Sequence, residues 1–219
     1  MKTIKVTGKG KIKVKPDVTR ISIELNSIEP TYDETLHKST ADTNQLKDLF
    51  AEFGFERSDL KTTYFNIDSE YESYKENNTY KERLIGYRYS HSMKLEFDSD
   101  NELLGKILYA LGKSPLNPRF HISYTVKNPE TAKNELLGKA VCDAKSKAVI
   151  LTDSAGVKLG DIQNIDYSWG EIEFVSRPMG RDMMLSECCD TAESLSYDID
   201  IEPDDIDVAD TVTVVWEIL

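Results

Sequence analysis

Residues 129–155 constrain the fold most, because they predict one long helix with a narrow face of small side chains. Asn128-Pro129-Glu130 combines a capping side chain, a proline at the first helical position and an acid in the first turn. Gly156 marks the expected end of the helix. Small or apolar side chains recur at every fourth position, at Ala132, Leu136, Ala140, Ala144 and Ala148. A face this narrow lets a helix lie close to a sheet.

The first residues predict a β-strand with one buried face. Apolar residues and glycines occupy the even positions of 4–14, and lysine fills most odd positions, which is a period of two. Gly8 and Gly10 fall on the inner face, so either another element approaches closely there or the strand bends. Residues 15–17 predict a turn around a proline. The alternation at 21–25 then predicts a second strand that completes a hairpin.

Changes of period along the chain predict the remaining elements. Helical spacing of apolar residues is found at 31–53 and again near 99–111. Alternating patterns predict strands at 62–71, 84–97, 120–126, 162–169, 196–201 and 210–219. The stretch at 72–83 is polar and carries Asn77-Asn78, which is interpreted as a flexible hairpin tip. The order β β α β β α β α β β β predicts an α+β fold with helices packed on a largely antiparallel sheet.

The organisation and the charge of the chain are uneven at its C-terminal end. No linker-like composition interrupts the 219 residues, so 1–219 is interpreted as a single domain with an irregular insertion at about 170–195. The net charge of −12 argues against general nucleic-acid binding. All of it resides in 182–219, whereas lysines crowd the first strand. We expect this basic strand to lie near the acidic last strands, within or between subunits; two separate solvated faces are the alternative.

No apolar run approaches the ~20 residues of a membrane helix, so no membrane span is expected. The N-terminal residues lack a secretory apolar region. Three cysteines, Cys142, Cys188 and Cys189, are too few for a disulfide framework. These features favour the cytoplasm. Cys188 and Cys189 are interpreted as a packed or exposed pair rather than a redox pair.

No motif in the sequence predicts a catalytic centre, a cofactor or a metal. His37, His91 and His121 lack any zinc-binding spacing. By its strand parity His91 is interpreted as a hydrogen-bonded core histidine, and His121 is expected to face solvent. The acidic run at 198–207 has Pro203 where a calcium loop needs glycine, which favours a solvated strand face over a calcium site.

Two groups of residues are candidate interfaces. Tyrosine offers large contact area at low entropic cost, so an exposed subset of the central tyrosines, Tyr71, Tyr74 and Tyr80, is one candidate. Packing of these tyrosines across strands is the alternative. Methionine-rich surfaces adapt to partners, which makes a second candidate of Met179, Met183, Met184 and Leu185.

Several short motifs occur in a characteristic order. They are Val6-Thr7-Gly8-Lys9-Gly10, Val14-Lys15-Pro16-Asp17, Gly86-Tyr87-Arg88, Ala144-Lys145-Ser146-Lys147-Ala148, Ala155-Gly156-Val157-Lys158-Leu159-Gly160 and Val208-Ala209-Asp210-Thr211-Val212-Thr213-Val214. In this order the chain resembles the SIMPL-domain family, which includes the bacterial YggE-like proteins. The resemblance implies an α+β fold, no established enzymatic chemistry and large homo-oligomers. Many bacterial relatives are periplasmic, and some are linked to stress tolerance.

These observations predict a non-enzymatic, self-associating binding or scaffold protein of the SIMPL type. One alternative is a small-ligand carrier or an enzyme, with a pocket between sheet and long helix that uses His91 and nearby tyrosines. The other alternative is a protein–protein adaptor.

Overall fold

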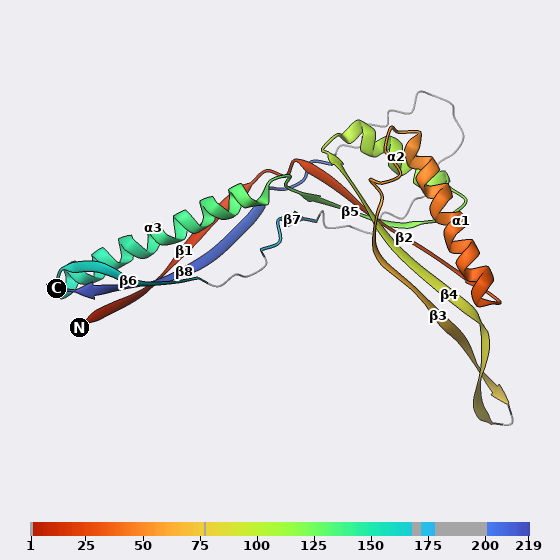
Figure 1. Ribbon diagram of the computed structural model, residues 1–219, viewed down its shortest axis with the longest axis horizontal. Helices are drawn as coiled ribbons and strands as arrows, with labels where there is room; N and C mark the ends of the chain where they lie inside the picture. The colour runs from red at the N-terminus through yellow and green to blue at the C-terminus, as the bar shows by residue number, and fades with distance from the viewer. Residues whose placement is uncertain (1, 77, 168–171, 178–200) are drawn as a thin grey trace. The chain divides into compact units, whose positions relative to one another are not determined.

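The computed structural model describes residues 2–76, 78–167, 172–177 and 201–219 (Figure 1). The chain divides into two compact units, one made of Met1–Asp17, Thr125–Ser176 and Pro203–Leu219, the other of Val18–Tyr124 and Arg177–Glu202. Each unit packs helices on an antiparallel sheet, which confirms the α+β class with two sheets in place of one. The single domain with an insertion at about 170–195 stays a prediction, because most of that insertion lies outside the described residues.

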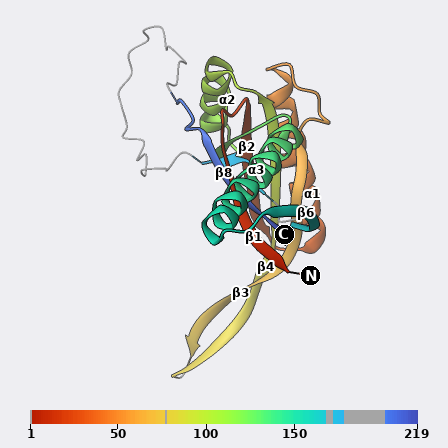
Figure 2. The ribbon, with the colours of Figure 1, turned by 90° about the vertical axis from the view of Figure 1, so that its left-hand side faces the viewer.

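The first unit is a three-stranded sheet covered on one face by a single helix (Figure 2). Its elements are β1 (Thr3–Val14), α3 (Pro129–Ala155), β6 (Leu159–Tyr167) and β8 (Ile206–Ile218), with the two-residue β7 (Val175–Ser176). The strand order is β1-β8-β6. The first and last strands pair along their whole lengths, from Thr3 opposite Glu217 to Val14 opposite Ile206. The predicted hairpin of the first two strands is therefore wrong, because β1 takes β8 as its partner.

Close contact between α3 and β1 depends on the two glycines of β1. The predicted limits of α3 are confirmed, and its alanine face is buried on the sheet. A Cβ atom at Gly8 would lie 2.0 Å from the carbonyl oxygen of Ala140, and one at Gly10 would lie 2.2 Å from that of Leu136. Of the two alternatives for these glycines, the structure confirms the close approach.

Polar side chains of α3 bind the backbone of β1, the edge strand of this sheet. The carboxylate of Asp143 accepts a hydrogen bond of 2.7 Å from the backbone N–H of Lys9. Lys147 donates to the carbonyl of Thr7 at 3.4 Å and pairs with Asp143 at 2.7 Å. These contacts lower the pKa of Asp143 below its ordinary value, the hydrogen bond from Lys147 most of all. Backbone groups that would otherwise offer an open edge are thus engaged.

The basic first strand does lie beside the acidic last strand, as expected. Charge contributes little to their pairing, however. Lys13 and Asp207 form an exposed ion pair at 3.6 Å. The other lysines of β1 face uncharged residues of β8, with Lys9 opposite Thr211 and Lys11 opposite Ala209. The buried even positions of both strands, which contact α3, provide most of the stabilisation.

The sheet of the second unit has the strand order β3-β4-β2-β5, with the short β7 next to β5, and two helices pack on one of its faces. The elements are β2 (Val18–Glu29), α1 (Tyr32–Ala51), β3 (Lys61–Glu76), β4 (Thr79–Asp98), α2 (Asn101–Lys113) and β5 (Arg119–Thr125). Alternate residues of β2 and β4 pack against both helices and form the largest core, with Ile23, Met93, Phe50, Leu104 and Ile107 among its members. The opposite face of β2 and β4 is polar.

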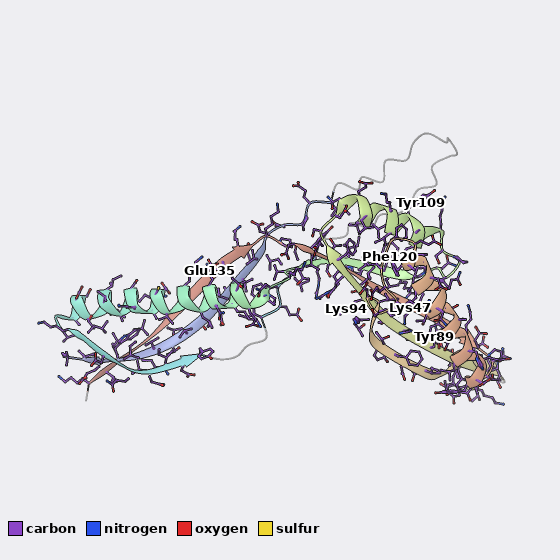
Figure 3. All side chains as sticks on the ribbon, turned by 45° about the horizontal axis from the view of Figure 1, so that its top comes forward. Lys47, Tyr89, Lys94, Tyr109, Phe120 and Glu135 are labelled. Atoms are coloured by element: carbon purple, nitrogen blue, oxygen red, sulfur yellow. The ribbon has the colours of Figure 1, made fainter. Side chains whose placement is uncertain are left out.

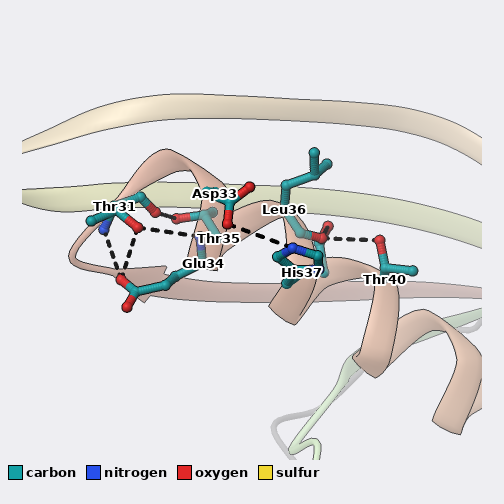
Figure 4. A network of polar contacts seen from close by, with 8 residues as sticks. Thr31, Asp33, Glu34, Thr35, Leu36, His37 and Thr40 are labelled. Atoms are coloured by element: carbon teal, nitrogen blue, oxygen red, sulfur yellow. Dashed lines mark hydrogen bonds and ion pairs between the residues drawn. The ribbon is translucent and has the colours of Figure 1, made fainter.

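The start of α1 is fixed by its sequence and by the sheet (Figure 4). Thr31 and Glu34 form a reciprocal capping box, in which each side chain accepts a hydrogen bond from the other's backbone N–H at 3.2 Å. The hydroxyl of Thr35 lies 2.8 Å from the carbonyl of Thr31 and 3.2 Å from that of Tyr87 on β4. The helix is thereby attached to the sheet where β4 leaves β2.

We expect Gly8→Ala to destabilise the protein by about 1–3 kcal/mol, because the new methyl group would overlap backbone atoms of α3. Gly138→Ala is the matched control, since a Cβ there meets nothing within 4 Å. Alanine at this helical position should stabilise by about 0.5–1 kcal/mol. Urea unfolding of both variants measures the two effects, and equal stabilities would contradict the close packing.

Candidate functional site: the β3–β4 arm

The hairpin of β3 and β4 continues past the rest of its sheet (Figure 1). Pairing between β2 and β4 ends where Glu29 lies opposite Tyr87. Beyond that point residues 79–86 of β4 pair only with residues 70–76 of β3. We call these two segments the arm. At ~3.3 Å per residue, seven residues span roughly 23 Å.

Cross-strand pairs of polar residues make the arm a regular ribbon. The guanidinium of Arg83 donates two hydrogen bonds to Glu72, at 2.7 and 3.0 Å, and lies 5.9 Å from the ring centre of Tyr74. The ammonium of Lys75 lies 5.9 Å from the ring centre of Tyr80. The predicted strand limits at Tyr71 and Leu84 are therefore wrong, because both strands continue almost to the turn, where Asn78 has a φ of 64°.

Large side chains of the arm remain in solvent. Tyr80 is 76% exposed, Tyr71 58% and Tyr74 38%. Tyr74 and Tyr80 each contact a cation across the strands. A role of the tyrosines as an interface stays a prediction. Leu84, which lies opposite Tyr71, and Ile85 are exposed as well. The arm is thus a two-stranded ribbon that carries an apolar and aromatic surface.

A bulge explains why the alternation of residues does not reveal Ile85 as a member of this surface. Alternation alone places Ile85 on the buried face with Tyr87. In the structure the register between β3 and β4 shifts beside Tyr71. Gly86 has a φ of 157°, and a Cβ there would lie 2.4 Å from the carbonyl oxygen of Glu29. The glycine inside a strand pattern was the available signal for this irregularity.

An ion pair with two hydrogen bonds lies at the base of the arm. Arg88 of β4 donates two hydrogen bonds of 3.0 Å to the carboxylate oxygens of Glu70 on β3. The hydrogen bond from Arg88 holds the pKa of Glu70 below its ordinary value. Because a two-point contact fixes orientation, this pair holds the two side chains in a defined position across β3 and β4.

The second candidate interface, Met179, Met183, Met184 and Leu185, lies outside the described residues. The same holds for Cys188 and Cys189 and for residues 198–200 of the acidic run, and Ile201 is not part of a strand. These interpretations stay predictions.

The structure confirms His91 as a hydrogen-bonded core histidine. Its Nδ1 lies 3.0 Å from the hydroxyl of Thr43 on α1, and its Nε2 lies 2.8 Å from the hydroxyl of Thr62 on β3. Phe65 meets the ring edge-on, with 5.1 Å between ring centres. Burial lowers the pKa of His91, and the ammonium of Lys47 lowers it further. His91 therefore faces α1 of its own unit instead of the long helix α3. His121 is exposed, as expected.

A second buried polar contact joins α1 to β4. The hydroxyl of Tyr89 donates a 2.6 Å hydrogen bond to Asp42, whose other carboxylate oxygen lies 2.6 Å from the ammonium of Lys38. Tyr89 is labelled in Figure 3. Burial and the bond to Asp42 raise its pKa. The sequence did not predict this contact, because an aspartate within a polar helix is usually solvated. Tyr89 and His91 thus both attach the helix to the sheet.

A hollow of about 230 Å³ lies on the face of the second sheet opposite α1 and α2. Its polar lining comes from β2, β3, β4 and β5 and consists of Ser22, Glu24, Thr63, Ser92, Arg119 and His121. His91 does not line this hollow, so the pocket expected around His91 in the small-ligand alternative is not found here.

The sequence matches the model of the SIMPL family, described as proteins of unknown function (DUF541), over residues 4–216. The chain belongs to the SIMPL family. It is 30% identical over 178 residues to the 26 kDa periplasmic immunogenic protein of Brucella melitensis biotype 1. The protein of the same name from Brucella abortus strain S19 matches to the same extent. Each alignment covers 80% of this SIMPL chain and 67% of the relative.

Among the residues described for this SIMPL protein, no helix has the length and apolar character needed to span a membrane.

The buried histidine predicts an acid-sensitive stability for this SIMPL protein. In the unfolded chain His91 takes up a proton near its ordinary pKa of about 6.5, whereas in the folded state its pKa is lower. Unfolding therefore binds a proton, and the free energy of unfolding should decrease as pH falls below about 6.5. Urea unfolding between about pH 7.5 and pH 5.5 measures this decrease.

His91→Gln keeps a hydrogen-bonding side chain without the titration, so it should flatten this part of the pH dependence. His121→Gln is the matched control and should retain the wild-type decrease, since His121 is exposed. A decrease of the same size in all three proteins would rule out His91 as its origin.

Proposed function

We propose that this SIMPL protein is a non-enzymatic binding or scaffold protein that self-associates through the β3–β4 arm. The observation that carries the proposal is the exposure of Tyr71, Tyr80 and Leu84 on a ribbon that projects beyond its sheet. A stress-related role, implied by the family resemblance, is part of the same proposal.

The physical argument for a contact through the arm concerns stability and surface. A two-stranded ribbon without a third layer is marginally stable in water, so a partner that covers it would stabilise it. Tyrosine is enriched in protein interfaces, where its large ring is buried at low entropic cost. A second copy carries the same ribbon, and symmetric pairs of identical surfaces are the commonest form of self-association.

The chemistry of the second unit favours a binding role over catalysis. His91 and Tyr89 are the titratable side chains of its core nearest to the arm, and both are occupied by hydrogen bonds to α1 or β3. A general acid or base needs a polar atom within reach of a substrate. Neither side chain offers one, which supports a structural role for both.

The names of the relatives bear on location. Both are named periplasmic proteins. We therefore favour an extracytoplasmic compartment over the cytoplasmic location expected from composition. Fractionation of the source cells, followed by immunoblotting, tests this: recovery with periplasmic markers is expected, and recovery with cytosolic markers alone would contradict it.

Substitution of arm residues tests the proposed self-association. We expect Tyr80→Ser and Tyr71→Ser each to raise the dissociation constant roughly tenfold or more, because truncation of a central aromatic residue at an interface typically costs about 2 kcal/mol. Sedimentation velocity over a range of protein concentrations measures the change.

Tyr64→Ser is the matched control, since Tyr64 lies on β3 like Tyr71, is 53% exposed and is outside the arm. It should leave the assembly intact. A wild-type protein that stays monomeric at micromolar concentration would contradict the proposal. An equal loss in all three variants would show that the arm is not the contact.

A further inference from the structure

A hollow of about 500 Å³ lies in the first unit where β1 ends and β8 begins. Two lysines of β1, Lys11 and Lys13, line it together with Lys139 of α3 and Asp207 of β8. The rest of its lining consists of Ile12, Val208 and Ala209. Three lysines from two elements and one aspartate therefore line the hollow, and the buried side chains of Ile12 and Val208 pack against α3.

The nearby carboxylates do not neutralise this hollow. Lys13 pairs with Asp207 at 3.6 Å, and both side chains are about 70% exposed (70% and 71%). Lys139 pairs at 2.8 Å with Glu135 of its own helix (Figure 3). Exposed ion pairs of this kind contribute little to the stability of the fold. Lys11 lies opposite Ala209 and forms no ion pair with the described residues. The hollow thus keeps a net positive charge.

The strand holds like charges together at a cost. Lys9, Lys11 and Lys13 lie on one face of β1, and alternate residues of a strand are ~6.8 Å apart. Like charges on one face of a strand pair are destabilising. Lysine on an edge strand also discourages strand addition. Here Asp143 and Lys147 already engage the backbone of that edge, and Lys139 is not part of the strand. Edge protection alone therefore does not account for the cluster.

We propose that this hollow binds an oligophosphate group. Its volume exceeds the ~300 Å³ lower bound of ordinary ligand sites, which leaves room for more than one phosphate. Lysine binds phosphate as a point charge, and three lysines line the hollow. The lining also has no aromatic ring for a base to stack on. Recognition thus rests on the phosphates alone, and it is independent of the arm.

Isothermal titration of the full chain with sodium tripolyphosphate tests the site. We expect saturable binding that weakens as salt rises, since charge drives it. Lys11→Gln and Lys139→Gln should each weaken binding roughly tenfold, because each removes a cation from the hollow. Lys5→Gln is the matched control: it removes the same charge from the same face of β1, outside the hollow. It should change the affinity less than about twofold.

A variant that gains affinity keeps the test independent of folding defects. Asp207→Asn removes the one carboxylate of the lining and should tighten binding severalfold. Asp166→Asn removes an exposed carboxylate of β6 that does not line the hollow, and should have no effect. Thermal unfolding of each variant confirms that it is folded.

Two further ligands test the chemical class. Citrate should bind much more weakly than tripolyphosphate, and equal affinity would overturn the preference for phosphate. ATP should bind as tightly as tripolyphosphate, since both offer a phosphate chain; much tighter binding would overturn recognition through phosphates alone. Equal losses of affinity in Lys11→Gln, Lys139→Gln and Lys5→Gln would show that binding depends only on the overall charge of the protein, and would overturn the site. Sedimentation in the presence of tripolyphosphate keeps this result separate from self-association, which should not change.

Discussion

The close approach of α3 to β1 is the constraint on which the first unit depends. The carbonyl oxygens of Leu136 and Ala140 occupy the space that side chains at Gly10 and Gly8 would need. Because the backbones approach this closely, side chains of α3 also reach the backbone of the edge strand, where Asp143 accepts a hydrogen bond from Lys9. Packing of small residues and protection of the edge therefore have one geometric origin.

Much of this arrangement could be predicted from local sequence. The limits of α3, its buried alanine face and the inward glycines of β1 all follow from short-range patterns, because caps, helical periods and strand alternation are set within a few residues. The partner of β1 could not be predicted in the same way. Sequence neighbours favour a hairpin, whereas the structure pairs β1 with β8, at the far end of the chain. Such long-range pairing leaves only weak traces in a single sequence.

The candidate site shows the same division. Tyr71, Tyr74 and Tyr80 could be singled out from composition, and all three are exposed. The length of the arm could not be predicted, because the alternation of apolar residues ends at Tyr71 and Leu84, whereas polar cross-strand contacts such as that of Arg83 with Glu72 extend the pairing. One of the two buried polar contacts between α1 and the sheet could be predicted. His91 followed from strand parity, but the contact of Asp42 with Tyr89 depends on how the helix lies on the sheet.

The pairing of β1 with β8 also affects the order in which the chain can fold during synthesis. The hydroxyls of Thr7 and Thr213 lie 2.9 Å apart, although 206 positions separate them in the chain. β1 leaves the ribosome well before β8, so β1 has no strand partner in its own sheet while the residues between them are synthesised. Val18–Tyr124, by contrast, holds β2, α1, β3, β4, α2 and nearly all of β5 in one continuous stretch. During synthesis this internal segment can therefore acquire its structure before the sheet of the first unit is complete.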